Sequence, residues 1–210
     1  MSLDVAIDAT FAAKGVSVRL GCVIAAIDGA AGGDVGPAID ALELPTGDMP
    51  AIAATRAAYK ALGKDPSRYR PASEALRRRV LKGAAVPRIN PLVDLNSWLS
   101  LATGFACGVY DRGRLEPPCT LRVGAPGETY DAIGRGAFNL QDLPVLVDRR
   151  GPFGSPTSDT VRTAVDQGTT RPWLVVFDFG GGDLGAALAM AADAFERYWR
   201  AVDVRSWTTD

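Results

Sequence analysis

The sequence predicts an α/β (α+β) fold in which flanking helices cover a mixed β-sheet. Segments with helical periodicity and segments with strand character alternate along the chain, with no Pro/Ser-rich linker and no internal repeat between them. The strand candidates between Cys107 and Val147 have no helical segment between them, so part of the sheet is expected to be antiparallel. A hydrophobic content of 47% with 22% charged residues is typical of a packed core. We expect one domain spanning residues 1–210.

The first elements are a strand and a helix. Residues 16–27 (VSVRLGCVIAAI) are β-branched and apolar and are bounded by glycine-containing turns, which predicts a buried strand. Residues 29–36 are rich in Gly, Ala and Asp and are expected to form a loop. Residues 50–62 predict a helix, because Asp48 can cap it, a proline opens it and a glycine follows it.

Two further helices are expected before the main group of strands. The first runs from about residue 71 to residue 83 and carries Glu74 four positions before Arg78, a favourable pair on a helix surface. The second starts at Pro91, is capped by Asn90 and ends at Gly104. Its expected buried face, at helical spacing, consists of Leu92, Leu95, Trp98, Leu99 and Ala102.

The second half of the chain predicts strands and a closing helix. The expected strands are residues 107–110, 120–123, 145–147 and 173–179. The last helix is expected to begin at Asp183 and to continue to about Trp199. The glycine run between the last strand and this helix could present backbone amides to a phosphate, but it matches neither GxxxxGK[ST] nor GxGxxG, so a plain connection is favoured.

Composition excludes several classes of site. The chain has no histidine, which removes Ser-His-Asp and Cys-His catalytic sets and histidine zinc sites. Cys22, Cys107 and Cys119 are widely spaced, so we expect no disulfide framework and no metal, and we expect no other cofactor. No apolar run approaches the roughly eighteen residues of a membrane helix, and the N-terminus lacks a signal pattern, so a cytoplasmic protein without membrane contact is expected.

Positive charge is concentrated in residues 68–82, although the net charge of the chain is −1. Arginines interleaved with Tyr69 in this segment could contact the phosphates of RNA. A solvated helix end, balanced by Glu74 and by the helix dipole, explains the same pattern, and both interpretations remain open. The candidate RNA-binding residues are Arg70, Arg77, Arg78 and Lys82.

An ordered set of residues starts in the segment PRINPLVDLNSWLSLATGFACGVYD, residues 87–111. The set consists of Ile89-Asn90, Val93-Asp94, Asn96, Gly104, Tyr110-Asp111, Leu121-Arg122-Val123 and Gly127-Glu128. In this order it resembles the B3/4 domain of the bacterial phenylalanyl-tRNA synthetase β-subunit, with its IN…VVD..N…G…FD…L…R.A..GE pattern. The string from residue 70 to residue 101 looks like the stand-alone B3/4 proteins, which lack the rest of the synthetase.

This resemblance implies a layered α/β sandwich and an editing activity, since the domain in the synthetase hydrolyses tyrosine wrongly esterified to the phenylalanine tRNA. Gly108 stands where the synthetase has a histidine that lines the editing pocket, and Ala106 stands for a proline. In the synthetase a glutamate recognises the hydroxyl of the tyrosine. The corresponding segment of this chain falls near residues 169–178, where Asp178 is the nearest acidic match. Hydrolysis without histidine is feasible, because an aminoacyl ester is already activated and positioned water can attack it.

The resemblance also implies a pocket at strand ends, built from segments that are distant in sequence. Residues 151–171 are dense in hydroxyl groups and turn residues, so they are expected either to line this pocket or to form ordinary surface turns. The predicted catalytic residues are Asp159 and Asp178, which could orient water. The predicted substrate-binding residues are Asn96, Asp111, Ser158 and Arg162, of which Arg162 could also stabilise an oxyanion.

The first hypothesis for function is a free-standing B3/4 protein that binds aminoacyl-tRNA or an amino-acid-like small molecule. If it is an enzyme, it is expected to hydrolyse misacylated tRNA in trans. The alternative is a non-catalytic RNA-binding, small-molecule-binding or interaction domain, and a hydrolase unrelated to tRNA is a third. The sequence does not decide between catalysis and binding, and it leaves the oligomeric state open.

Overall fold

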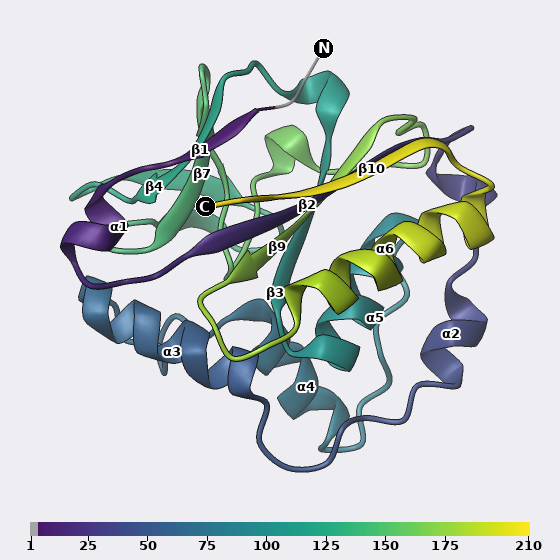
Figure 1. The fold of residues 1–210 in the computed structure, drawn as a ribbon, viewed down its shortest axis with the longest axis horizontal. Helices are drawn as coiled ribbons and strands as arrows, with labels where there is room; N and C mark the ends of the chain where they lie inside the picture. The colour runs from purple at the N-terminus through teal and green to yellow at the C-terminus, as the bar shows by residue number, and fades with distance from the viewer. Residues whose placement is uncertain (1–3) are drawn as a thin grey trace.

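In the computed structural model, which describes residues 4–210, two four-stranded sheets pack face to face and helices cover the outer face of one of them (Figure 1). The first sheet has the order β1-β4-β7-β8 and is mixed, because β1 is parallel to β4 whereas the other pairs are antiparallel. The second sheet has the order β10-β2-β9-β3 and is antiparallel throughout. This layered α/β arrangement with a mixed sheet confirms the expected fold class.

The bounds of the elements are as follows. The first sheet consists of β1 (Val5–Ile7), β4 (Cys119–Val123), β7 (Pro144–Asp148) and β8 (Gly151–Gly154). The second sheet consists of β2 (Arg19–Ala26), β3 (Ala106–Asp111), β9 (Pro172–Asp178) and β10 (Val202–Thr209). Strands β5 (Thr129–Ala132) and β6 (Gly136–Asn139) form a separate hairpin. The helices are α1 (Thr10–Ala13), α2 (Gly36–Asp40), α3 (Pro50–Leu62), α4 (Ala72–Val80), α5 (Pro91–Thr103) and α6 (Leu184–Trp199), with 3-10 turns η1 (Ala30–Gly32), η2 (Arg112–Arg114) and η3 (Val161–Thr163).

The central strand β9 is buried on both of its faces. Because side chains alternate across a strand, Leu174 and Val176 point toward the helices, whereas Trp173, Val175 and Phe177 point into the space between the two sheets. All seven residues of β9 are buried, which explains why its sequence reads as a continuous apolar run rather than as an alternation. The fold therefore has one core above this sheet and a second core below it.

Helices α5 and α6 cover the outer face of the second sheet. Asn90 caps α5 as expected, with its side-chain oxygen 3.1 Å from the amides of Leu92 and Val93. The Asp183 side chain caps α6 by accepting a hydrogen bond from the Ala186 amide, 2.9 Å away. Gly21 on β2 allows α6 to lie close to the sheet, because a Cβ there would be 2.7 Å from the Leu184 side chain.

Helix α3 packs against the edge of both cores and against a third apolar cluster. Ala58 and Leu62 face the core between the sheets, and Tyr59 packs with residues of β5 and β7. The helix has the predicted bounds, but the predicted cap was wrong. Met49 occupies the capping position and makes no side-chain cap, so Asp48 has no role there. The helix predicted for residues 71–83 ends earlier than expected, at Val80.

The strands and helices predicted from the sequence are all present, with boundary differences of a few residues. Strands β1, β5, β6, β8 and β10 were not predicted, nor were the short helices α1 and α2. The expected loop at residues 29–36 contains the 3-10 turn η1 and the start of α2. Within residues 4–210, no helix combines the length and the apolar character needed to cross a membrane.

Two tryptophans allow the packing to be tested. Trp173 is fully buried between the sheets, whereas Trp98, predicted to be buried on α5, is only partly covered at the margin of the outer core. Trp173→Ala is expected to lower the free energy of unfolding by about 3–5 kcal/mol, the usual cost of truncating a buried aromatic side chain. Trp98→Ala is expected to cost less. Urea unfolding followed by circular dichroism measures both, and equal costs would contradict this packing.

Candidate functional site

The structure does not bring the six predicted site residues together. Strands β3 and β9 pair so that Asp111 lies opposite Pro172 and Ala106 lies opposite Phe177. Asp111 and Asp178 therefore lie at opposite ends of the sheet, about 20 Å apart at the rise per residue of an antiparallel strand. The prediction that both approach one pocket was wrong, because the register of β3 and β9 separates them.

Asn96 and Asp159 lie on different sides of the same sheet. Asn96 belongs to α5, which packs on the helix-covered face through Leu95 and Leu99. Asp159 contacts Tyr110, whose ring lies in the core between the sheets. A shared pocket for Asn96 and Asp159 is therefore excluded, because the sheet separates them. The side-chain oxygen of Asn96 is nevertheless buried and has no hydrogen-bond partner within residues 4–210.

Two of the predicted residues are held in ion pairs. The Arg19 guanidinium contacts Asp178 at 2.6 and 3.0 Å, and the Gly180 amide donates to the same carboxylate at 2.7 Å. The Arg162 guanidinium binds the Asp148 carboxylate through two hydrogen bonds of 2.9 and 3.0 Å. These pairs fix β9 to β2 and η3 to β7. Because Asp178 and Arg162 are both held in these ion pairs, neither side chain is available for the role predicted for it.

Asp111 also serves its local structure. Its carboxylate accepts hydrogen bonds from the Gly113 amide at 2.8 Å and from the Thr169 hydroxyl at 3.2 Å. The first contact caps the 3-10 turn η2 that follows β3, and the second joins this turn to the segment that precedes β9. Asp111 therefore links the turn after β3 to the segment before β9, at one end of the second sheet.

Asp159 is different, because it meets a buried tyrosine. The Tyr110 hydroxyl donates a 2.8 Å hydrogen bond to Oδ1 of Asp159. Tyr110 is fully buried, and its ring packs edge-on against Phe153 at a centroid distance of 5.1 Å. Asp159 as a whole residue is partly exposed, so this contact lies where the core between the sheets reaches the surface.

Two glycines make room for the Tyr110 hydroxyl. A Cβ on Gly108 would lie 2.2 Å from this oxygen, and a Cβ on Gly154 would lie 2.1 Å from it. Gly108 precedes Tyr110 by two positions on β3, so both residues face the core between the sheets. At the position where the resemblance places a histidine, this chain therefore has a space that its own tyrosine occupies.

The segment from Ser155 to Thr160 supports Asp159 with a dense set of hydrogen bonds. The Ser155 hydroxyl donates to the Ser158 carbonyl at 2.8 Å, and the Tyr130 hydroxyl donates to the same carbonyl. The Ile133 amide donates to the carbonyl of Asp159 at 2.9 Å. Ser158 thus contributes its backbone to the site. These contacts hold the backbone beside Asp159 in a single arrangement.

The surroundings of Asp159 favour its neutral form more than water does. Burial raises the pKa of Asp159 to about 7, although hydrogen bonds from the Tyr110 hydroxyl and the Ser155 backbone act in the opposite direction. Burial also raises the pKa of each cysteine thiol, Cys22, Cys107 and Cys119, to about 12, which makes them poor nucleophiles. Asp159 can therefore take up and release a proton near neutral pH, which is what a general base requires.

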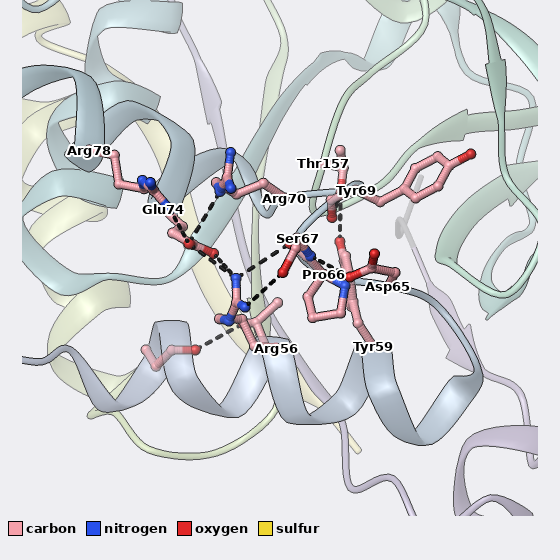
Figure 2. A network of polar contacts seen from close by, with 12 residues as sticks. Arg56, Tyr59, Asp65, Pro66, Ser67, Tyr69, Arg70, Glu74, Arg78 and Thr157 are labelled. Atoms are coloured by element: carbon pink, nitrogen blue, oxygen red, sulfur yellow. Dashed lines mark hydrogen bonds and ion pairs between the residues drawn. The ribbon is translucent and has the colours of Figure 1, made fainter.

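A second group of charged residues lies on α3, on α4 and on the segment between them (Figure 2). The buried carboxylate of Glu74 is shared by three arginines, at 2.8 Å from Arg56, 3.2 Å from Arg70 and 3.7 Å from Arg78. Of the predicted RNA-binding residues, Lys82 is exposed and Arg78 is half exposed. Arg77 is buried instead, and Nη2 donates to the carbonyl of Pro45 at 2.6 Å.

The arginine group and the Asp159 site adjoin each other. The Ala72 amide at the start of α4 donates a 2.8 Å hydrogen bond to the Pro156 carbonyl. The Thr157 hydroxyl is 2.8 Å from the Tyr59 hydroxyl and also contacts the carbonyl of Tyr69, the residue before Arg70 (Figure 2). A single segment of chain therefore carries Asp159 on one side and packs against the arginine-bearing helices on the other.

Several residues of this arrangement were not predicted from the sequence. Tyr110, Tyr130 and Ser155 supply the hydroxyls around Asp159, and Arg56 with Glu74 organises the charged group. Tyr110 carried the one available signal, since it is a polar aromatic residue in an otherwise apolar strand and needs a partner when buried. In the described part of the chain, no group of three or more His, Cys, Asp or Glu residues could hold a metal ion.

Comparison with known proteins gives one family and one fold. The model of the B3/4 domain family matches residues 54–209. The structure is similar to the crystal structure of an N-terminal fragment of the phenylalanyl-tRNA synthetase β-subunit from Pyrococcus horikoshii, with a TM-score of 0.57 and 11% sequence identity. The match covers 100% of this chain and 51% of that fragment, so the chain spans about half the fragment's length. No curated protein matches the sequence.

The raised pKa of Asp159 predicts a pH-dependent stability. Because the pKa in the folded state is about 7 and that of an unfolded aspartate is about 3.9, the folded protein binds this proton more tightly. Stability is therefore expected to fall as the pH rises from about 4 to about 7. Asp159→Asn removes this dependence and keeps an acceptor for Tyr110. The variant should gain stability relative to the wild type at pH 8 compared with pH 5, as measured by urea unfolding, whereas exposed Asp131→Asn should show no such gain.

The close approach of Gly108 and Tyr110 predicts an energetic coupling between them. Gly108→Ala is expected to lower the free energy of unfolding by about 1–3 kcal/mol, because the methyl group overpacks the space that holds the Tyr110 hydroxyl. In a Tyr110→Ala background the same change should cost much less. A double-mutant cycle in urea measures the coupling, with Gly32→Ala, which meets no atom within 4 Å, as the control. Additive costs would show that the two residues do not compete for this space.

Proposed function

This chain belongs to the B3/4 domain family, and we propose that it acts as a free-standing B3/4-type domain that binds aminoacyl-tRNA and hydrolyses the ester of misacylated tRNA in trans. The observation that carries the proposal is the Asp159 carboxylate, whose pKa of about 7 suits a general base at neutral pH. Asp159 is partly exposed, so water can reach it. An aminoacyl ester needs no further activation, and orienting a water molecule supplies much of the required rate acceleration.

The proposed catalytic residue is Asp159, and Asp178 is not assigned a catalytic role. Asp178 is bound by Arg19 and by the Gly180 amide at the far end of the sheet, where its charge stabilises the pairing of β2 and β9. The Arg162 guanidinium is likewise held in an ion pair with Asp148. We assign to Asp159 the water that attacks the ester carbonyl, and a neighbouring ribose hydroxyl of the tRNA can share in this proton transfer.

The basic residues on and beside α4 support the tRNA part of the proposal. Arg70, Arg78 and Lys82 can contact phosphates, because such contacts depend on charge and need no fixed sequence of bases. The segment from Pro156 to Asp159 connects this group to the proposed ester site, through the hydrogen bond between the Pro156 carbonyl and the Ala72 amide. An RNA backbone bound at the start of α4 would lie beside the segment that carries Asp159.

One observation favours a second candidate function, a non-catalytic binding domain. The Tyr110 hydroxyl already donates to Asp159 and occupies the space beside Gly108 and Gly154. A substrate that used this space would have to displace Tyr110. A protein that kept the fold and binds RNA through its arginines would have no need of such a displacement.

The test is deacylation of a panel of misacylated tRNAs by the wild type and by Asp159→Asn. We expect hydrolysis above the buffer rate, rising with pH through about 7 as Asp159 loses its proton, and a loss of about 100-fold or more in the variant, the scale of a general-base contribution. Asp131→Asn, an exposed carboxylate on the neighbouring strand β5, is the matched control and should retain activity.

Binding of the same tRNAs separates the two functions. Arg78→Glu should weaken binding and reduce its dependence on salt, whereas Arg150→Glu, equally exposed on the turn between β7 and β8, should not. Deacylation absent on every tRNA, with binding that Arg78→Glu weakens, would favour the non-catalytic domain. Full activity in Asp159→Asn would exclude Asp159 as the base.

A further inference from the structure

A cavity of about 360 Å³ opens between α3, α4 and the chain that precedes α3. Its volume is within the range of small-molecule sites. Its lining includes the apolar side chains of Met49, Ile52 and Leu81 and three arginines, Arg56, Arg77 and Arg78. The cavity thus offers an apolar surface and positive charge to the same ligand.

The charges around this cavity do not balance. Glu74 and Asp48 are the two carboxylates that line it, against three arginines. Glu74 is moreover shared with a further arginine, Arg70, which lies 3.2 Å from it. The cavity between the end of β2 and the end of α6 has no such excess, since one aspartate and one arginine, Asp28 and Arg200, line it. The excess of positive charge favours an anionic ligand at the first cavity.

Arg77 supplies an independent indication of a ligand. Its side chain lines the cavity although the residue is only 8% exposed. Nη2 donates to the carbonyls of Pro45 and Gly47 at 2.6 and 3.1 Å, whereas Nη1 is buried and has no hydrogen-bond partner within residues 4–210. No carboxylate of the described residues forms an ion pair with Arg77. A buried guanidinium without a counter-charge is costly, and a bound anion would offset that cost.

We propose that this cavity binds the phosphate group of a nucleotide, with the phosphate on Arg77 and Arg78 and the base against Ile52 and Leu81. Guanidinium groups match the geometry of phosphate oxygens and can bind two of them at once. Leu81 is 61% exposed, so an apolar partner would cover a side chain that is now in contact with water. The nucleotide can be free or can be one unit of an RNA chain, and in the second case the inference rests on the proposed function.

Calorimetric titration of the full chain at low salt tests the site, with adenosine monophosphate and adenosine as probes. The monophosphate should bind, and adenosine should bind at least about tenfold more weakly, since it lacks the group that the arginines recognise. Arg78→Gln and Arg77→Met should each weaken binding of the monophosphate about tenfold, the loss of one charge-assisted hydrogen bond. Arg150→Gln is the matched control, because Arg150 has the same 53% side-chain exposure and the same 3.7 Å ion-pair distance as Arg78.

A variant that is expected to strengthen binding keeps the proposal testable if Arg77→Met fails to fold. Glu74→Gln removes the negative charge that competes for the arginines, and it should strengthen binding of the monophosphate. Equal affinity for both probes would overturn the proposal, as would binding that neither arginine variant changes. Weaker binding in Glu74→Gln, with the fold intact by circular dichroism, would also overturn it.

A single-stranded RNA oligonucleotide identifies the source of the phosphate. If it displaces the monophosphate and Arg78→Gln weakens both to the same extent, the site takes a nucleotide of RNA. If it does not displace the monophosphate, the site takes a free nucleotide. Either result is independent of deacylation, since Asp159→Asn should leave the titration unchanged. A chain that binds the monophosphate as described and deacylates no tRNA would refute the proposed hydrolase and retain this site.

Discussion

The burial of one sheet on both faces is the constraint on which the rest of this structure depends. Strand β9 contributes alternate side chains to the core beneath the helices and to the core between the sheets, and none of its seven residues is exposed. A polar side chain in the middle of such a strand would need a buried partner on one side or the other. Charged groups are therefore confined to the strand ends, where Asp178 pairs with Arg19 and Asp111 caps the turn after β3. The carboxylates at these ends stabilise the sheet, and the same geometry keeps them apart.

Tyr110 is the residue at which a polar group enters this core, and the local structure follows from accommodating it. Its ring fills the space between the sheets, and its hydroxyl requires an acceptor, which Asp159 provides at 2.8 Å. The hydroxyl also requires room, which the absence of side chains at Gly108 and Gly154 provides. Burial raises the pKa of the Asp159 carboxyl to about 7, although the hydrogen bond donated by the Tyr110 hydroxyl acts in the opposite direction. One aromatic residue thus accounts for two glycines and for the hydrogen bond to an aspartate 49 positions away in sequence.

The sequence was informative where structure is local and much less so where it depends on distant contacts. Proline, cap and glycine signals located α3, α5 and α6 to within a few residues, and apolar runs located β2, β3 and β9. The strand β10 was missed because it is an edge strand of largely exposed residues, VDVRSWTT, without an apolar run. The site was predicted only in part. Asp159 was identified from the polar character of its loop, but neither its contact with Tyr110 nor the wide separation of Asp111 from Asp178 follows from local patterns, because the sheet register determines both.

The residues that carry the family resemblance mostly maintain the scaffold. Asn90 caps α5, and the Asp94 carboxylate accepts a hydrogen bond from the Ile89 amide at 2.9 Å, so this part of the motif fixes the start of one helix. Glu128 binds the Arg122 guanidinium through hydrogen bonds of 2.5 and 2.8 Å and thereby fixes the turn after β4. Position 108, by contrast, lies between the sheets beside the Tyr110 hydroxyl and takes no part in these capping and ion-pair contacts. A chain can therefore preserve this fold while its chemistry changes, and the activity of this protein must be tested at Asp159 and at the arginines of α3 and α4.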